Sequence, residues 1–156
     1  MSRRERATKR KIAPDAKYKS VLVQKFINKL MMMGKKATAE KIFYSAMEEI
    51  QKKTGKDALI VFETAIKNVA PLMEVKPRRV GGSTYQIPIE VERERGVSIA
   101  MTWLKTAAQD RGGRSMIEKL SAEMLDAVNG AGGAAKKRED LHKTAEANKA
   151  FAHFRW

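Results

Sequence analysis

Residues able to bind a metal or perform covalent catalysis are few in this chain and lie far apart. Cysteine is absent, and the two histidines, His142 and His153, are separated by eleven positions. Zinc sites take cysteine and histidine ligands at short, regular spacings, which this pair does not provide. We therefore expect no metal site, no thiol chemistry and no cofactor.

Two glycine-containing segments are candidates for phosphate binding. Thr54-Gly55-Lys56 resembles the end of a phosphate-binding loop, but no glycine lies five residues before Gly55 and no strand leads into it. Gly81-Gly82 precedes a strand pattern rather than a helix, and no serine stands in a GxSxG context. The sequence therefore predicts no enzymatic site, and an enzyme acting on RNA is the least favoured function.

The chemistry that remains is electrostatic. The chain has 32 lysines and arginines against 18 acidic residues, a net charge of +14 and a pI of about 10.1. Residues 1–36 hold twelve of the bases and two of the acids. Each base that meets a phosphate releases a condensed counterion, so clustered bases favour a nucleic-acid partner. The alternative is a solvated charge excess that only maintains solubility.

Length and composition indicate the framework that must hold these charges. The 156 residues suit one domain, here 1–156, and 43% hydrophobic with 32% charged residues is a globular composition. No apolar run approaches the ~20 residues that cross a bilayer. A secretory signal requires an apolar segment after its basic residues, and none follows Lys11. We expect a soluble cytoplasmic protein without a membrane partner.

Apolar spacing predicts six helices. Two are expected over residues 20–33 and 38–53, ended by Gly34 and Gly55. A third begins at an Asp57 cap and ends by Pro71, and a fourth covers residues 92–109 with Trp103 in the core. A capping box at Ser115 opens the fifth, and the sixth begins near Ala134.

A change to a period of two predicts a β-hairpin over residues 73–91. Its second strand has one buried face made by alternating residues, Tyr85, Ile87, Ile89 and Val91. Residues 1–11 are too polar to form a core and are expected to be a flexible basic arm. The predicted fold is therefore mainly α: a six-helix bundle with one protruding β-hairpin and a disordered basic N-terminal arm.

Basic loops join the predicted helices at 34–36 and 111–114, and a basic run at 136–138 opens the last helix. Each could equally be an ordinary solvated turn. No recognition helix or RNP-type strand is present, so the pattern favours folded RNA recognised by shape and phosphate. A basic architectural DNA-binding protein is the alternative.

Three motifs together resemble the bacterial small-subunit ribosomal protein seven family. They are residues 136–140 followed by 145–156, residues 75–82 with 85–88, and residues 33–36. The similarity covers essentially the whole chain in the same order. The sequence departs from the family pattern in the glycine-rich segment 130–133, and at Thr102, where a base is expected.

The resemblance implies a structural, non-enzymatic protein of the cytoplasmic ribosome. It implies primary binding to the 3′ major domain of the small-subunit ribosomal RNA and nucleation of the subunit head. It also implies a β-ribbon near the exit-site tRNA, with small-subunit ribosomal proteins nine and eleven as partners.

The candidate site residues follow from the charge pattern and the resemblance together. Candidate ribosomal RNA contacts are Arg3, Arg4, Arg6, Lys9, Arg10, Lys11, Lys35, Lys36, Arg95, Arg111, Arg114, Lys136, Lys137 and Arg138. Candidate contacts to ribosomal RNA or the exit-site tRNA are Lys76, Arg78, Arg79, Gly81, Gly82 and Tyr85. Candidate contacts to mRNA, tRNA or a partner protein are His142, His153, Arg155 and Trp156.

Overall fold

The computed structural model describes residues 8 and 10–154, and these contain six α-helices, one β-hairpin and a short 3-10 helix. The elements are α1 (Val21–Leu30), α2 (Lys36–Thr54), α3 (Ala58–Val69), β1 (Met73–Val80), β2 (Ser83–Glu90), α4 (Arg93–Asp110), α5 (Met116–Val128), α6 (Gly132–Ala147) and η1 (Lys149–Phe154). The mainly helical fold with one hairpin is thereby confirmed. Most of the predicted arm, residues 1–7 and 9, lies outside the described residues.

Three predicted helix boundaries are confirmed by their capping geometry. The Asp57 carboxylate accepts the Leu59 N–H at 2.9 Å and opens α3. The Ser115 hydroxyl accepts the Glu118 N–H at 3.3 Å and opens α5. Gly55 ends α2 in the left-handed conformation, at φ 66°, which glycine adopts without strain.

The predicted end of the first helix at Met33 is wrong, because α1 ends at Leu30. Met31 is extended, and residues 31–35 form a turn closed by the Lys35 N–H on the Met32 carbonyl at 3.0 Å. Met32 and Met33 are 59% and 91% exposed, so their apolar side chains face no core that would continue the helix. Helix α2 accordingly starts earlier than predicted, at Lys36, and α6 starts at Gly132 rather than near Ala134.

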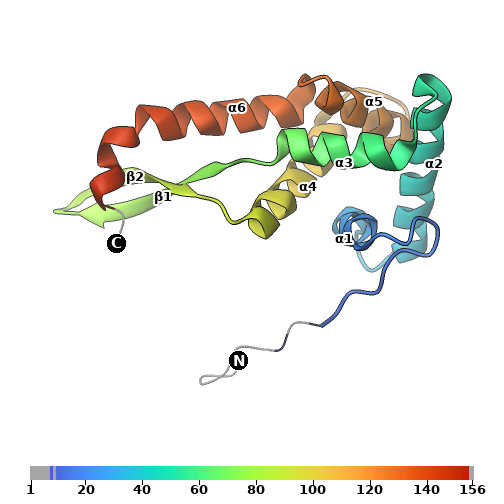
Figure 1. Cartoon of the computed structure of the whole chain (residues 1–156), viewed down its shortest axis with the longest axis horizontal. Coiled ribbons are helices and arrows are strands. Elements are labelled where there is room, and N and C mark those ends of the chain that lie inside the picture. Colours follow the sequence, from blue (N-terminus) through green and yellow to red (C-terminus); the bar gives the residue numbers. More distant parts are fainter. Residues whose placement is uncertain (1–7, 9, 155–156) are drawn as a thin grey trace.

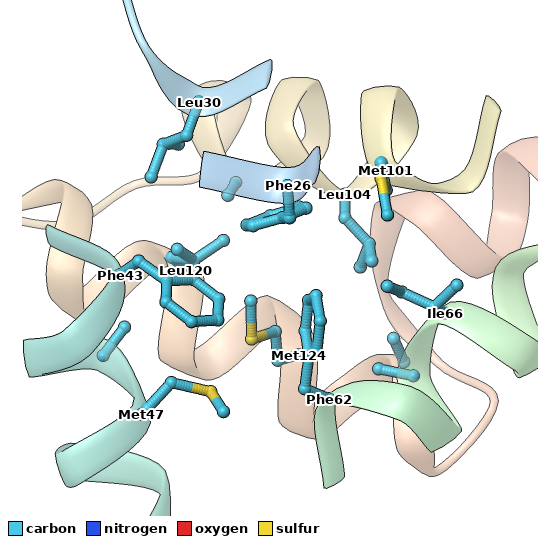
Figure 2. Packing of buried hydrophobic residues seen from close by; sticks show 14 of the residues in the cluster. Phe26, Leu30, Phe43, Met47, Phe62, Ile66, Met101, Leu104, Leu120 and Met124 are labelled. Atoms are coloured by element: carbon cyan, nitrogen blue, oxygen red, sulfur yellow. The ribbon is translucent and has the colours of Figure 1, made fainter. Parts of the chain in front are cut away.

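Three phenylalanines from α1, α2 and α3 meet at the centre of the helical body. The Phe26, Phe43 and Phe62 ring centroids lie 5.2–5.6 Å apart in tilted and edge-to-face arrangements. Leu104 of α4 and Met124 of α5 are fully buried in the same cluster (Figure 2). Trp103 is half-buried and packs against this cluster, in agreement with its predicted place in the core.

The β-hairpin leaves the helical body as a two-stranded antiparallel ribbon (Figure 1). Val80 pairs with Ser83, so the turn consists of Gly81 and Gly82 alone. Their φ angles are 58° and 91°, as a two-residue type I′ turn requires at both positions. The glycines therefore fix the register of the ribbon and the direction of its tip.

The predicted single buried face of the second strand is only partly correct. Ile87 is 1% exposed, but its neighbour Pro88 is also buried. Successive residues of a strand point to opposite faces, so the hairpin is covered on both faces near its base. Helix α6 lies along the hairpin and η1 folds down beside it (Figure 1). Val91 lies beyond the end of β2, although its N–H still bonds the Leu72 carbonyl at 2.9 Å.

Neighbouring residues on α3 allow a test of where the core lies. Phe62 is fully buried, whereas Ile60 is 62% exposed. We expect Phe62→Ala to lower the free energy of unfolding by about 3–5 kcal/mol, because it removes apolar burial and leaves a cavity. The control Ile60→Ala should change it by about 0.5 kcal/mol or less. Urea unfolding measures both, and similar losses for the two variants would contradict this core.

Candidate nucleic-acid interface

The segment that follows the N-terminal arm is fixed to the body by one buried carboxylate. Asp15 is 2% exposed and accepts the N–H groups of Lys17 and Tyr18 at 3.0 and 2.9 Å. The Tyr44 hydroxyl of α2 also donates to it, at 2.6 Å. Burial, with this hydrogen bond, raises the pKa of Tyr44. The chain that precedes Asp15 therefore leaves the body from a defined point, where Arg10 and Lys11 are exposed.

The turn between α1 and α2 presents two of the predicted RNA contacts to solvent. Lys35 and Lys36 are both exposed, and Gly34 allows the turn with φ 74°. Lys36 makes an exposed ion pair with Glu40 at 3.5 Å. Such a pair is weak, so the ammonium group can exchange this partner for a phosphate.

A hollow of about 1170 Å³ lies among α1, α3 and α4 beside the base of the hairpin, and the predictions from sequence missed it. Apolar side chains line it together with bases from three elements: Lys25, Lys29, Lys67 and Arg93. The spacing of Lys25 and Lys29 by four residues on one helix was a usable signal for a shared basic face.

Thr102 occupies a position where the family pattern predicts a basic residue. Its hydroxyl accepts a hydrogen bond from the Lys29 ammonium at 2.8 Å, and Lys29 also donates to the Ser98 carbonyl at 2.7 Å. Burial and the nearby Lys105 lower the pKa of Lys29. Positive charge at this place therefore comes from Lys29 of α1 together with Lys105 of α4, whose ammonium donates to the Lys29 carbonyl at 2.7 Å.

The end of the hairpin next to the helices carries ion pairs, whereas the residues near its tip are exposed. Glu74 is buried at the base and pairs with Arg95 of α4 at 2.8 Å and with Lys76 at 3.5 Å. The hydrogen bond from Arg95 lowers the pKa of Glu74. Beyond this pair, Arg78 and Arg79 are exposed, next to the exposed turn glycines.

The aromatic contacts of the C-terminal segment are made within the chain. The Tyr85 ring lies 5.0 Å from that of Phe151 in η1, so Tyr85, predicted to meet RNA or tRNA, already has an aromatic neighbour. His153 is exposed, and its Nδ1 lies 2.8 Å from the Ala150 carbonyl. The predicted contacts Arg155 and Trp156 lie outside the described residues.

The basic residues of the 111–114 loop and of α6 that were predicted to contact ribosomal RNA form two groups in the structure: some are exposed, and others pair within the protein. Arg114 and Lys136 are exposed. Arg111 instead pairs with Glu123 and Asp126 of α5, and its hydrogen bond with Asp126 raises the pKa of its guanidinium. The two other α6 bases also have internal partners: Lys137 donates to Thr106, and Arg138 to the Asn68 carbonyl.

Neither a metal centre nor a membrane span is found in the part of the chain that the structure describes. No group of three or more histidine, aspartate or glutamate side chains there could hold a metal ion. None of the described helices is long and apolar enough to cross a membrane.

These observations define a class of protein: a basic helical body with exposed cations on its helices, on its turns and on an extended hairpin. A family model described as Ribosomal protein S7p/S5e matches residues 2–149. The small ribosomal subunit protein uS7 of Dictyoglomus thermophilum is 59% identical over the full length of both chains. Those of Carboxydothermus hydrogenoformans and Vibrio campbellii are 59% and 57% identical, again over the full length of both.

The chain belongs to the ribosomal protein S7p/S5e family. It is a structural protein of the small subunit of the cytoplasmic ribosome and not an enzyme. The resemblance drawn from its motifs is thereby confirmed.

His142 provides a test of how α6 holds the hairpin. Its Nε2 accepts the Leu72 N–H at 3.1 Å, and burial, followed by the charge of Arg138, lowers its pKa below the ordinary 6.5. The unfolded chain then binds a proton on His142 more readily than the folded chain does. The stabilisation that neutral His142 provides is therefore complete above pH 6.5 and is lost as the pH drops through the lowered pKa.

We expect the free energy of unfolding to fall as the pH drops below about 6.5, and His142→Gln to remove most of that fall. The exposed His153 supplies the matched control, since His153→Gln should retain it. Urea unfolding at several pH values measures the effect. An unchanged pH dependence in His142→Gln would show that His142 is not protected in this way.

Proposed function

We propose that this chain is a primary binder of small-subunit ribosomal RNA. It binds the 3′ major domain, nucleates assembly of the subunit head and holds its hairpin near the exit-site tRNA. The observation that carries this proposal is the hairpin, because it extends the exposed Lys76, Arg78 and Arg79 away from the helices, while Glu74, the partner of Lys76, stays buried at its base.

The arrangement favours folded RNA over duplex DNA. Among the candidate contacts, exposed bases lie on the 34–36 turn, the hairpin, Arg114 and the start of α6, which are separate elements around one core. Bases distributed in this way suit a partner that is itself folded and presents phosphates on several sides. Duplex DNA binders instead place one helix or ribbon in a groove.

Small-subunit ribosomal proteins nine and eleven are the protein partners we propose. Their inclusion rests on the family resemblance. The segment formed by η1 and the hairpin is the surface we assign to partner proteins, mRNA or tRNA. These elements lie at the end of the molecule away from α2 (Figure 1), and they include Tyr85, Phe151 and His153.

The direct test is equilibrium binding of the full-length chain to a folded transcript of the 3′ major domain and to duplex DNA of equal length. We expect tighter binding to the RNA at every salt concentration, with a steep loss of affinity as salt rises. Equal affinities for the two nucleic acids would support the architectural DNA-binding alternative instead.

The arm is expected to add affinity without adding stability. Deletion of residues 1–11 removes Arg3, Arg4, Arg6, Lys9, Arg10 and Lys11. Because each phosphate contact releases about one counterion, the deletion should weaken RNA binding and flatten the plot of log K against log salt. Binding titrations and thermal unfolding measure the two properties. An unchanged slope would mean that the arm neutralises no phosphates.

The hairpin tip is expected to act in binding and not in folding. Replacing Lys76, Arg78 and Arg79 by alanine should weaken RNA binding or alter release of exit-site tRNA. The free energy of unfolding should change by only about 0.5 kcal/mol, since all three side chains are exposed.

The matched control replaces three exposed lysines, Lys52 and Lys53 in the last turn of α2 and Lys56 in the loop that follows it. It removes the same charge from a surface remote from the hairpin (Figure 1). A hairpin variant that unfolds, or one that binds RNA and releases tRNA as the control does, would count against the assignment.

A further inference from the structure

Arg111 ends α4, and its guanidinium is held by two carboxylates of the neighbouring helix. It lies 3.1 Å from Glu123 Oε2 and also pairs closely with Asp126. The Arg111 side chain is 31% exposed, whereas that of Glu123 is 3% exposed. A buried carboxylate needs such a partner, so both terminal nitrogens of the Arg111 guanidinium donate to carboxylates of α5.

Glu123 uses its second oxygen to hold a third helix. Its Oε1 accepts the N–H of Ala134, in the first turn of α6, at 2.8 Å. The N-cap residue of α6, Ala131, provides no side-chain hydrogen bond, so a carboxylate from α5 satisfies this helix start instead. Negative charge at a helix N-terminus is also favoured by the helix dipole. One carboxylate thus joins the end of α4 to the start of α6.

The glycines of the unexpected glycine-rich segment make this contact possible. A Cβ on Gly132 would lie 2.9 Å from Glu123 Oε1, and one on Gly133 would lie 3.2 Å from the Ala107 Cβ of α4. Gly132 also has φ 87°, a conformation that side chains other than glycine rarely adopt. The segment therefore allows α6 to approach both α4 and α5 closely.

We propose that Arg111, Glu123 and the N-terminus of α6 form a clasp that sets the direction of α6, and that Arg111 serves RNA binding by positioning this helix rather than by contacting phosphate. This inference rests on the proposed RNA-binding function. Helix α6 carries Lys136 and lies along the hairpin, so a change in its direction moves both basic elements relative to the body (Figure 1).

The test compares Arg111→Gln with Arg114→Gln, a matched loss of one charge from an exposed position in the same loop. Arg111→Gln should lower affinity for the folded 3′ major-domain transcript about tenfold, as for loss of one member of a coupled network. Arg114→Gln should reduce the salt slope of binding by about one. Arg111→Lys should resemble Arg111→Gln, because an ammonium group cannot replace the planar fork between two carboxylates.

Glu123→Gln separates positioning from charge. It removes a negative charge, which by electrostatics alone would tighten binding to RNA. The clasp predicts weaker binding instead, since the amide oxygen can still accept from Ala134 but no longer pairs with Arg111. The control Glu146→Gln removes the same charge from an exposed position on α6 and should not weaken binding.

The direction of α6 can be measured directly because the chain has no cysteine. Spin labels on cysteines introduced at the exposed positions Lys52 of α2 and Lys143 of α6 report the distance between these helices. We expect a narrow distance distribution in the parent chain and a shifted or broadened one in Arg111→Gln, Arg111→Lys and Glu123→Gln. A local loss of stability alone would not change this distance distribution at a temperature where the variants remain folded.

An unchanged distance distribution together with a salt slope reduced by about one in Arg111→Gln would overturn the proposal and make Arg111 a phosphate contact. Should Arg111→Gln fail to fold, Arg111→Lys and Glu123→Gln give the same decision. A parent chain that does not prefer the ribosomal transcript would contradict the proposed function, while the distance measurement would still decide whether the clasp exists.

Discussion

The structure depends on the burial of three phenylalanine rings where α1, α2 and α3 meet. Phe26, Phe43 and Phe62 leave no exposed surface and pack in tilted and edge-to-face arrangements, with α4 and α5 closing the cluster around them. A close-packed interior of this kind has one arrangement rather than many. The basic turns, the hairpin and the basic helix faces are all attached to this cluster, so the geometry of the cationic surface follows from the packing of the core.

The basic residues of this chain have two roles: some pair within the protein, and others face solvent. Some pair within the protein: Arg95 with the buried Glu74, although the Arg95 side chain is itself 57% exposed, Arg111 with Glu123, and Arg138 with a backbone carbonyl. Others, such as Arg78, Arg79 and Arg114, are exposed. Net charge counts both groups equally, but only exposed bases are free to release counterions when a polyanion binds. The internally paired group instead connects the hairpin, α4, α5 and α6.

Much of the fold could be predicted from the sequence because apolar spacing and capping residues are local signals. Asp57, Gly55 and Ser115 set boundaries that agree with the structure. The end of α1 could not be predicted from three consecutive methionines, because whether they face a core depends on tertiary contacts. For the same reason, the sequence identified the basic segments but not which of their bases, such as Arg111, pair internally. The glycines at 132 and 133 were recognised as unusual, and only the approach of α6 to Glu123 and Ala107 explains them.

The central claim is that a body already folded around its phenylalanine cluster presents separate basic elements to a folded RNA. Amide hydrogen exchange of the full-length chain, alone and bound to the 3′ major-domain transcript, tests this most directly. The account predicts that exchange in the buried parts of α3 and α5 is nearly unchanged by RNA, while exchange slows at the 34–36 turn, the hairpin tip and the start of α6. Large changes in α3 and α5, with none at these basic elements, would contradict it.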